Sequence, residues 1–221
     1  MKLFYTPIFD LIHKVQVVAI EAGLYDKIER IPTNPFKRDP AHVAANPLSK
    51  VPTLVLDDGT PLYGGPVIYE YLDSLHNGPK LFPPSGMARW NALRLMGLGD
   101  GLWDVEVSRA GEQDRPKELY SEEVNQKHWA TVVRALDQLE KEAPTWKGFD
   151  VGQISVACGL MYLDRRMALG KVPVDWRTNR PNLTKWYDEI RKRPSMQPHD
   201  NDFRTAMNNG DLSPRTGFPK K

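Results

Sequence analysis

The residues with the clearest chemical meaning lie at one tight turn, where two adjacent glycines, Gly64 and Gly65, are followed by Pro66. The apolar residues after this turn recur with a helical period. Proline suits the first position of a helix, because the N–H that it lacks would have no partner within the helix. The free N–H groups that remain at such a helix start favour an anion. The turn therefore predicts an anion-binding site, with a plain tight turn as the alternative.

The composition of the chain is that of an ordinary soluble globular protein, with 40% hydrophobic and 26% charged residues. Its 221 residues carry a formal net charge of only +2, which argues against a nucleic-acid-binding surface. No apolar run approaches the roughly 20 residues that a membrane span needs. The first residues lack the long apolar core of a signal peptide. We therefore expect a cytoplasmic protein with neither nucleic acid nor a membrane as its partner.

Cysteine and histidine are too sparse to predict a disulfide bond or a metal site. The single cysteine, Cys158, excludes an internal disulfide bond and lies in an apolar run that predicts burial. The five histidines show no spacing typical of metal ligands, so we expect no metal.

The first part of the chain alternates between strand and helix patterns, and an Asp-Gly turn joins its last two strands into a hairpin. We expect strands at residues 2–5, 27–32, 52–59 and 60–63. Helices are expected after Asp10, which can cap the first of them, at residues 39–45, and after Pro66. The residues that share the buried face of the last helix are Ile68, Tyr71, Leu72 and Leu75. The order β-α-β-α-β-β-α predicts a mixed sheet with helices packed on it.

The chain becomes helical after a segment rich in proline and glycine, residues 76–86, which indicates a linker. Long helices are expected at about residues 88–115 and 121–142, and another begins near Asp150 and Gln153, which have the spacing of a capping box. Its run at residues 154–163 is apolar on all sides, as in the central helix of a bundle. The expected helix at residues 121–142 has an apolar stripe of Trp129, Val132, Leu136 and Leu139. A last helix has an apolar stripe of Leu183, Trp186, Tyr187 and Ile190. The predicted domains are residues 1–77 and 87–221, with a linker at 78–86.

Several motifs, in this order along the chain, resemble those of the cytosolic glutathione transferase family. The segments that carry the resemblance are MKLFYTP, NPLSKVPTLVLDDGTPLYGGPVIYEYLD, ISVACGLMYLDRR and RPNLTKWYDEIRKRPSMQ, and the match covers about residues 1–197. The resemblance implies an α/β, thioredoxin-like N-terminal domain and an all-α, helical C-terminal domain. It also implies a homodimer, an active site near the domain cleft, glutathione as co-substrate and no metal.

The same resemblance implies that glutathione binds to the main chain at residues 50–52. The Val51–Pro52 peptide bond is cis in the family and turns the N–H and C=O of Val51 toward the cysteinyl backbone of glutathione. At the positions of Gly64 and Gly65 the family usually places an acid and a serine, which hold the γ-glutamyl ammonium and carboxylate. Hydrogen bonds to charged groups contribute about 1.5–3 kcal/mol and neutral ones about 1 kcal/mol. Glycine at both positions therefore predicts binding weakened on the order of 10²-fold.

Catalysis in the family requires a hydrogen-bond donor at the end of the first strand. The donor lowers the pKa of the glutathione thiol and holds the thiolate, which is the nucleophile. Where bacterial relatives carry a serine or a cysteine, this chain has Phe9 and Asp10. Tyr5 matches the catalytic tyrosine of some branches and Thr6 matches a serine of others, so these two are the candidate catalytic residues. Packing in the core is the alternative for Tyr5.

The remaining assignments follow from position alone. Arg38 and His42 match positions where relatives sometimes have a basic residue for the glycyl carboxylate of glutathione, and a solvated charge is the favoured interpretation of both. Lys50 is a further candidate contact to glutathione, and Lys14 matches a basic family position but is expected to be an exposed surface residue. The pocket for the electrophile is assigned to Phe9, Trp103 and Val107, with the core or the dimer interface as the alternative for the tryptophan.

Two functions remain open. In the first, the protein is a glutathione transferase that conjugates the glutathione thiolate to a small apolar electrophile, a reaction of detoxification. In the second, the fold serves as a binding or scaffold protein, or acts on another ligand. The Val51–Pro52 motif favours the first function, and the pairs Gly64–Gly65 and Phe9–Asp10 favour the second.

Overall fold

The computed structural model describes residues 1–6, 10–34 and 37–197, and of residues 10–12 it describes the backbone alone. The described chain forms two compact units, one comprising Met1–Lys80 with Gln197 and the other Leu81–Met196. The division after Lys80 falls within the segment at residues 78–86 that was expected to be a linker.

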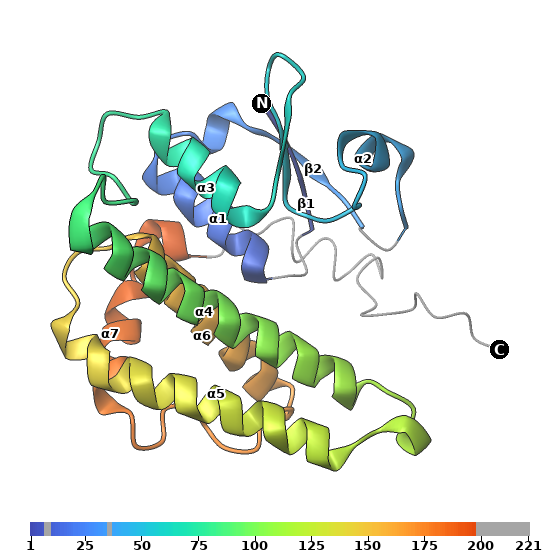
Figure 1. The fold of residues 1–221 in the computed structure, drawn as a ribbon, viewed down its shortest axis with the longest axis vertical. Coiled ribbons are helices and arrows are strands. Elements are labelled where there is room, and N and C mark those ends of the chain that lie inside the picture. The colour runs from blue at the N-terminus through green and yellow to red at the C-terminus, as the bar shows by residue number, and fades with distance from the viewer. Residues whose placement is uncertain (7–9, 35–36, 198–221) are drawn as a thin grey trace. The chain divides into compact units, whose positions relative to one another are not determined.

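The first unit is built on a four-stranded sheet with the strand order β2-β1-β3-β4 (Figure 1). The strands are β1 (Lys2–Tyr5), β2 (Glu29–Pro32), β3 (Thr53–Val55) and β4 (Pro61–Tyr63). β1 runs parallel to β2 and antiparallel to β3, and β3 runs antiparallel to β4. The predicted mixed sheet and its terminal hairpin are confirmed.

Three helices complete the first unit: α1 (Asp10–Glu21), α2 (Pro40–Ala45) and α3 (Gly65–Ser74). α1 and α3 pack side by side, and α2 lies on the other side of the strands (Figure 1). The core between helices and sheet consists of fully buried aliphatic side chains, among them Val15, Val18, Leu54, Ile68 and Leu72. Asp10 is the first residue of α1 rather than the residue before it.

The buried face of α3 differs from the predicted one. Ile68 and Leu72 are buried as expected, but Tyr71 is only half-buried and Leu75 is 44% exposed. Tyr69 and Asp73 take the buried positions instead. Both stripes fit the period of a helix. The observed stripe passes through Gly65, which leaves room on that face for the large ring of Tyr69.

The second unit is all-helical, and the long helix α4 (Gly86–Gln113) runs beside α5 (Glu122–Glu142) and α6 (Val151–Ala168) in Figure 1. The fourth helix, α7 (Pro181–Ile190), contacts α5 and α6. The buried residues of α5 include Val132, Leu136 and Leu139, whereas Trp129 is half-buried. These helices confirm the predicted all-α region.

α6 lies at the centre of this unit, with Cys158 buried on it. Small residues allow α4 to approach closely, because a Cβ at Gly99 would stand 2.6 Å from the main chain of Ser155. The capping box is confirmed: Asp150 accepts hydrogen bonds from the backbone N–H groups of Gly152 and Gln153, and the Gln153 side chain accepts one from the Asp150 N–H. Burial raises the pKa of Asp150.

Neither a membrane span nor a metal cluster is found among the described residues. Within the described ranges, no helix is both long enough and apolar enough to cross a membrane. The same residues contain no group of three or more histidine, cysteine, aspartate or glutamate side chains placed to hold a metal ion.

Candidate functional site

The ends of three strands bring the predicted site residues of the first unit to one edge of the sheet. Phe4 pairs with Thr53, and Thr53 pairs with Tyr63. Because Tyr5 follows Phe4, Pro52 precedes Thr53 and Gly64 follows Tyr63, these three site residues lie in one row across β1, β3 and β4. Segments that are far apart in the sequence thus form a single edge.

A buried hydrogen-bond cluster holds the loop that leads into β3, where the Val51–Pro52 peptide bond is cis. The carbonyl oxygen of Lys50 accepts hydrogen bonds from His42 Nε2 at 3.1 Å, Asn46 Nδ2 at 3.0 Å and Thr53 Oγ1 at 2.8 Å. The other Nδ2 hydrogen of Asn46 reaches Thr53 Oγ1 at 2.9 Å. This cluster, which we call the Lys50 cradle, fixes the main chain next to Val51.

The position of His42 corrects the expectation of a solvated charge, because its side chain is completely buried. Its ring stacks on Phe4, with the ring centroids 5.3 Å apart. Since a carbonyl oxygen can only accept, the bond to Lys50 requires that His42 carry a hydrogen on Nε2. No sequence pattern indicates this role, because it depends on how α2 packs against the end of β1 and the loop before β3.

Tyr5 and Thr6 lie at the end of β1, and each is only 1% exposed. The backbone carbonyl of Tyr5 accepts a hydrogen bond from Thr33 N–H at 2.6 Å, which anchors this end of the strand. Both candidate hydroxyls are therefore carried by rigid, buried residues. Phe9, assigned to the electrophile pocket, lies outside the described residues.

The N-terminus of α3 has the free N–H groups that its sequence predicts. Gly64 precedes the helix with a φ of 81°, a left-handed conformation that favours glycine and explains why no acidic side chain stands there. No side chain caps the helix. The first hydrogen bond of the helix runs from the Ile68 N–H to the Gly64 carbonyl at 3.2 Å. The N–H groups of Gly65 and Val67 come before it and therefore have no acceptor within the helix.

Gly65 is required by the side chain one turn further along α3. A Cβ built on Gly65 would stand 2.3 Å from the hydroxyl oxygen of Tyr69 and 2.6 Å from Cζ of its ring. A serine at position 65 is therefore incompatible with Tyr69 as it stands. The sequence signal for this contact is a glycine and an aromatic residue four positions apart on one helix face.

Lys14 on α1 faces the same ring and corrects the expectation that it is a surface residue. Its side chain is fully buried, and its Nζ lies 4.6 Å from the centroid of the Tyr69 ring. An ammonium group over an aromatic face is attracted by the ring's negative charge density. A cation is thus buried between α1 and α3, one turn below the N-terminus of α3.

The other predicted residues are divided between the two units. Arg38 and Lys50 are exposed in the first unit. Val51, which follows Lys50 in the chain, is half-buried. Trp103 and Val107 lie one turn apart on α4 in the second unit, where both are half-buried. The ring of Trp103 lies 6.1 Å from that of Tyr162 on α6, measured between centroids.

Comparison with protein families matches two consecutive parts of the chain. Residues 12–75 match the glutathione S-transferase N-terminal domain, and residues 121–189 match the C-terminal domain of the same family. These two matches fall in the sheet-containing unit and in the helical unit, respectively.

Individual proteins resemble the chain over most of its length. An uncharacterized GST-like protein of Escherichia coli, YibF, is 29% identical over 201 residues, which is 89% of this chain and 96% of that protein. A glutathione transferase family member from Pseudomonas fluorescens, solved with S-(propanoic acid)-glutathione, is 38% identical with a TM-score of 0.78, covering 89% of this chain and 96% of that one. A glutathione S-transferase from Methylobacillus flagellatus with glutathione bound is 31% identical with a TM-score of 0.79, covering 88% and 96%. The chain belongs to the glutathione S-transferase family.

Proposed function

We propose that this protein is a cytoplasmic glutathione transferase that joins the sulfur of glutathione to a small apolar electrophile. The observation that carries the proposal is the row of Tyr5, Pro52 and Gly64 along one sheet edge. Two structures that resemble the chain, from Pseudomonas fluorescens and Methylobacillus flagellatus, contain S-(propanoic acid)-glutathione and glutathione. Both similarities support glutathione as the co-substrate.

Main-chain groups would provide most of the binding. The peptide groups of Val51 pair with the cysteinyl backbone of glutathione, and the Lys50 cradle keeps them in place. The N–H groups of Gly65 and Val67 receive the γ-glutamyl carboxylate, because the N-terminus of a helix attracts an anion. The exposed cations of Arg38 and Lys50 attract the glycyl carboxylate.

The chemical step is a nucleophilic substitution or addition at carbon. The thiol of glutathione releases its proton to solvent, and the resulting thiolate uses an electron pair to form a carbon–sulfur bond. When the electrophile is an aryl halide, the halide departs with the electrons of the broken bond. The hydroxyl of Tyr5 or Thr6 donates a hydrogen bond to the thiolate, and the buried ammonium group of Lys14 favours the thiolate electrostatically.

The apolar part of the substrate would contact Phe9, Trp103 and Val107. Of these, Trp103 and Val107 present half-buried apolar surface on α4. An apolar wall of this kind binds many aryl and alkyl groups with little discrimination, because the hydrophobic effect has no directional preference.

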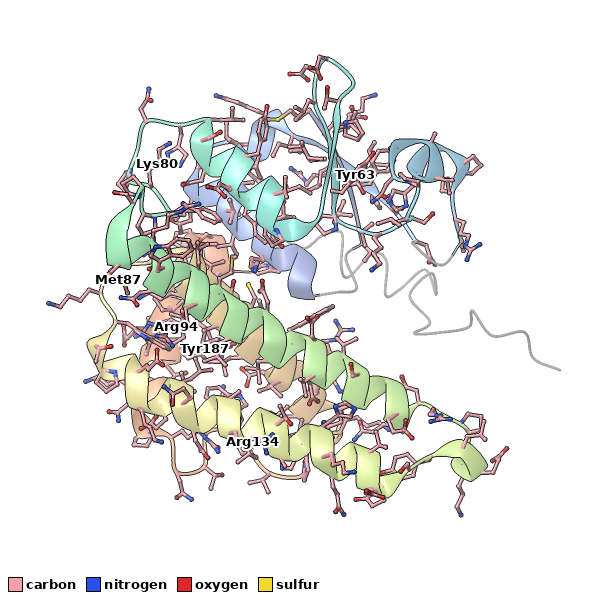
Figure 2. All side chains as sticks on the ribbon, in the orientation of Figure 1. Tyr63, Lys80, Met87, Arg94, Arg134 and Tyr187 are labelled. Carbon is pink, nitrogen blue, oxygen red and sulfur yellow. The ribbon has the colours of Figure 1, made fainter. Side chains whose placement is uncertain are left out.

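A second copy of the chain is the proposed partner. Large apolar side chains are exposed on both units, including Tyr63 and Met87, which Figure 2 labels, at 42% and 69%, and Trp90 at 62%. Burial of such side chains between two copies would remove apolar surface from water. Light scattering should give twice the mass of 25.2 kDa, and Trp90→Glu should shift the protein toward the monomer.

Calorimetric titration with glutathione tests the proposed function. Binding in the micromolar to millimolar range, together with conjugation of a generic aryl halide, is the expected result. Loss of activity without loss of glutathione binding in Tyr5→Phe or in Thr6→Ala identifies the catalytic hydroxyl. Absence of heat and of thermal stabilisation at millimolar glutathione would reject the transferase.

A binding or scaffold protein that uses another ligand is the second candidate. The observation that favours it is the replacement of the usual acid and serine by Gly64 and Gly65, with the space above Gly65 filled by Tyr69. This candidate predicts that the fold and the dimer survive without glutathione affinity. The same titration therefore separates the two functions.

A further inference from the structure

A cavity of about 470 Å³ lies in the helical unit, where α4 leads into α5 (Figure 1). Its walls come from the end of α4, the connection to α5, the start of α5 and the segment after α6. Four of its lining residues are basic and none is acidic; the basic ones are Arg109, Arg115, Lys117 and Lys171. The volume falls within the range of ordinary small-molecule sites, roughly 300–1,000 Å³.

A buried arginine reaches this cavity from α4. The side chain of Arg109 is fully buried and donates from Nε and Nη2 to the two carboxylate oxygens of Glu106, at 2.7 and 2.5 Å. Nη2 also donates to the carbonyl of Lys171 at 2.6 Å. Nη1 makes only a 3.4 Å contact with Asn125 Oδ1 among the described residues, which is long for a hydrogen bond. Nη1 thus retains donor capacity, although the whole side chain is buried behind the wall of the cavity.

The buried charges around Arg109 do not cancel. Arg166 on α6 lies with its Nε 3.7 Å from the same Glu106 carboxylate, and its Nε has no hydrogen-bond partner in the described part of the chain. One carboxylate therefore faces two buried guanidinium groups, which gives these three side chains a net charge of +1, while the buried Glu112 on α4 pairs with Arg115 instead. An uncompensated buried charge is unfavourable, and an anion in the adjoining cavity would offset it.

The rim of the cavity adds further positive charge. Lys117 and Lys171 are exposed, and neither ammonium group has an ion-pair partner among residues 1–6, 10–34 and 37–197. Arg115 pairs with Glu112 at 3.1 Å. The two lysines are therefore the rim charges available to a ligand.

Two acidic side chains near the cavity, Glu112 and Glu122, are already engaged, whereas Asp114 and Glu118 stand next to Arg115 and Lys117 in the chain. Glu112 accepts a hydrogen bond from Ser121 N–H at 2.7 Å, which holds its pKa below the usual value, and it also pairs with Arg115. Glu122 accepts from the Tyr120 hydroxyl, which likewise lowers its pKa. Glu112 neutralises Arg115, and the hydrogen bonds of both carboxylates help to orient the walls of the cavity.

We propose that this cavity is a binding site for a compact polyanion of the carboxylate or phosphate class. The buried charge of Arg109 attracts the anion from behind the wall, and Lys117 and Lys171 contact it at the rim. Planar guanidinium groups suit carboxylate and phosphate oxygens, and ammonium groups add charge without a fixed geometry. The site consists entirely of residues of the helical unit and is independent of the proposed glutathione site.

Titration of the full chain with three probes tests the proposal. Citrate and pyrophosphate represent the two ligand classes, and acetate is the control with one charge and a single carboxylate. At least one polyanion should bind at least tenfold more tightly than acetate and raise the unfolding temperature, because a ligand of the folded state stabilises it. The affinity should fall with added salt, since the rim charges are exposed to solvent. The comparison of citrate with pyrophosphate identifies the ligand class.

Two matched double variants locate the bound anion. Lys117→Gln with Lys171→Gln should weaken binding of the polyanion at least tenfold. Lys141→Gln with Lys185→Gln removes the same charge from exposed positions that do not line the cavity and should leave the affinity unchanged. All four lysines are exposed, so both variants should fold, which their unfolding temperatures verify. The proposal is overturned if neither polyanion binds at millimolar concentration, if the two double variants bind equally, or if glutathione displaces the anion.

Discussion

Two regions of this molecule are proposed to bind anions, and the groups proposed to bind them differ. At the sheet edge of the first unit the proposed groups are the main-chain N–H groups at the N-terminus of α3, together with the exposed cations of Arg38 and Lys50. In the helical unit they are side-chain cations around one cavity, with Arg109 as the buried member. The first region was visible in the sequence as a short motif, whereas the second is assembled from segments that are far apart.

The difference also determines which substitutions can damage each region. A peptide group cannot be removed by substitution, so the main-chain part of the sheet edge is vulnerable only through the side chains that position it. Each charge at the cavity can be removed singly, and the buried ones depend on their partners. The two regions should therefore differ in how strongly single substitutions affect stability and binding.

The largest effect is expected for Glu106→Gln. The variant leaves Arg109 and Arg166 buried without a counter-charge, and loss of one partner of a buried ion pair typically costs about 3–5 kcal/mol. Urea unfolding at pH 7 measures the change in the free energy of unfolding. Glu189→Gln, which removes an exposed partner of Lys192, serves as the control and should stay within about 0.5 kcal/mol of the parent. Equal stability of the two variants would contradict a buried net charge beside the cavity.

The next effect is expected for Asn46→Ala in the Lys50 cradle. The variant removes hydrogen bonds to the Lys50 carbonyl and Thr53 Oγ1 and leaves the Leu48 N–H without its side-chain acceptor. We expect a loss of about 2–3 kcal/mol in the free energy of unfolding, since net hydrogen bonds contribute about 1 kcal/mol each. The KM for glutathione should rise while the KM for the electrophile stays the same. Asn182→Ala, which breaks an exposed hydrogen bond to Glu140, is the matched control for both measurements.

A smaller effect, and a sharper test of the helix start, is expected for Gly65→Ser. The added side chain meets the Tyr69 hydroxyl, and overpacking of this kind typically costs about 1–3 kcal/mol. In a Tyr69→Ala background the contact is absent, so the same substitution should cost less by about 1 kcal/mol or more. A double-mutant cycle by urea unfolding measures this coupling. Additive effects would show that Tyr69 is not the reason for glycine at this position.

The sequence predicted those parts of the fold that local patterns specify. The turn between β3 and β4, the capping box of Asp150 and Gln153, and the central apolar helix all follow from short motifs whose residues are neighbours in the chain. The same holds for the Gly64–Gly65 turn at the start of α3. In each case the determining interactions span only a few residues.

The predictions that failed concern side chains whose surroundings come from another element. Lys14 is buried because α3 places Tyr69 against it, and His42 is buried because the carbonyl of Lys50 and the ring of Phe4 face α2. Tyr69 and Phe4 are distant in sequence from the residues that they cover, and Lys50 acts through its main chain, so charge alone favoured the surface. The cavity was missed for the same reason, because residues 109–125 and 170–173 meet only in the folded helical unit.

The smallest effect is expected for Glu142→Gln. This variant breaks a partly exposed ion pair, and its cost can be compared with that of breaking the buried Glu106–Arg109 pair. Arg94 on α4, which Figure 2 labels, donates two hydrogen bonds to the carboxylate of Glu142 on α5. Nη1 donates to Oε1 at 2.9 Å, and Nη2 donates to Oε2 at 2.7 Å. The Arg94 side chain is 55% exposed, and such pairs contribute about 0.2–1 kcal/mol. Loss of the pair at pH 7 should therefore cost less than 1 kcal/mol, several-fold less than Glu106→Gln.

The pH dependence of this effect has a definite sign. The hydrogen bond from Arg94 lowers the pKa of Glu142 below 4.5 in the folded protein. A lowered pKa means that the unfolded chain binds a proton more readily, so the contribution of the pair is complete above about pH 4.5 and is lost as the pH falls through the folded-state pKa. The difference between Glu142→Gln and the parent should thus shrink from pH 7 to pH 3 in urea unfolding. If it stays constant, or matches the cost of Glu106→Gln at pH 7, then exposure to solvent is not what separates the two ion pairs.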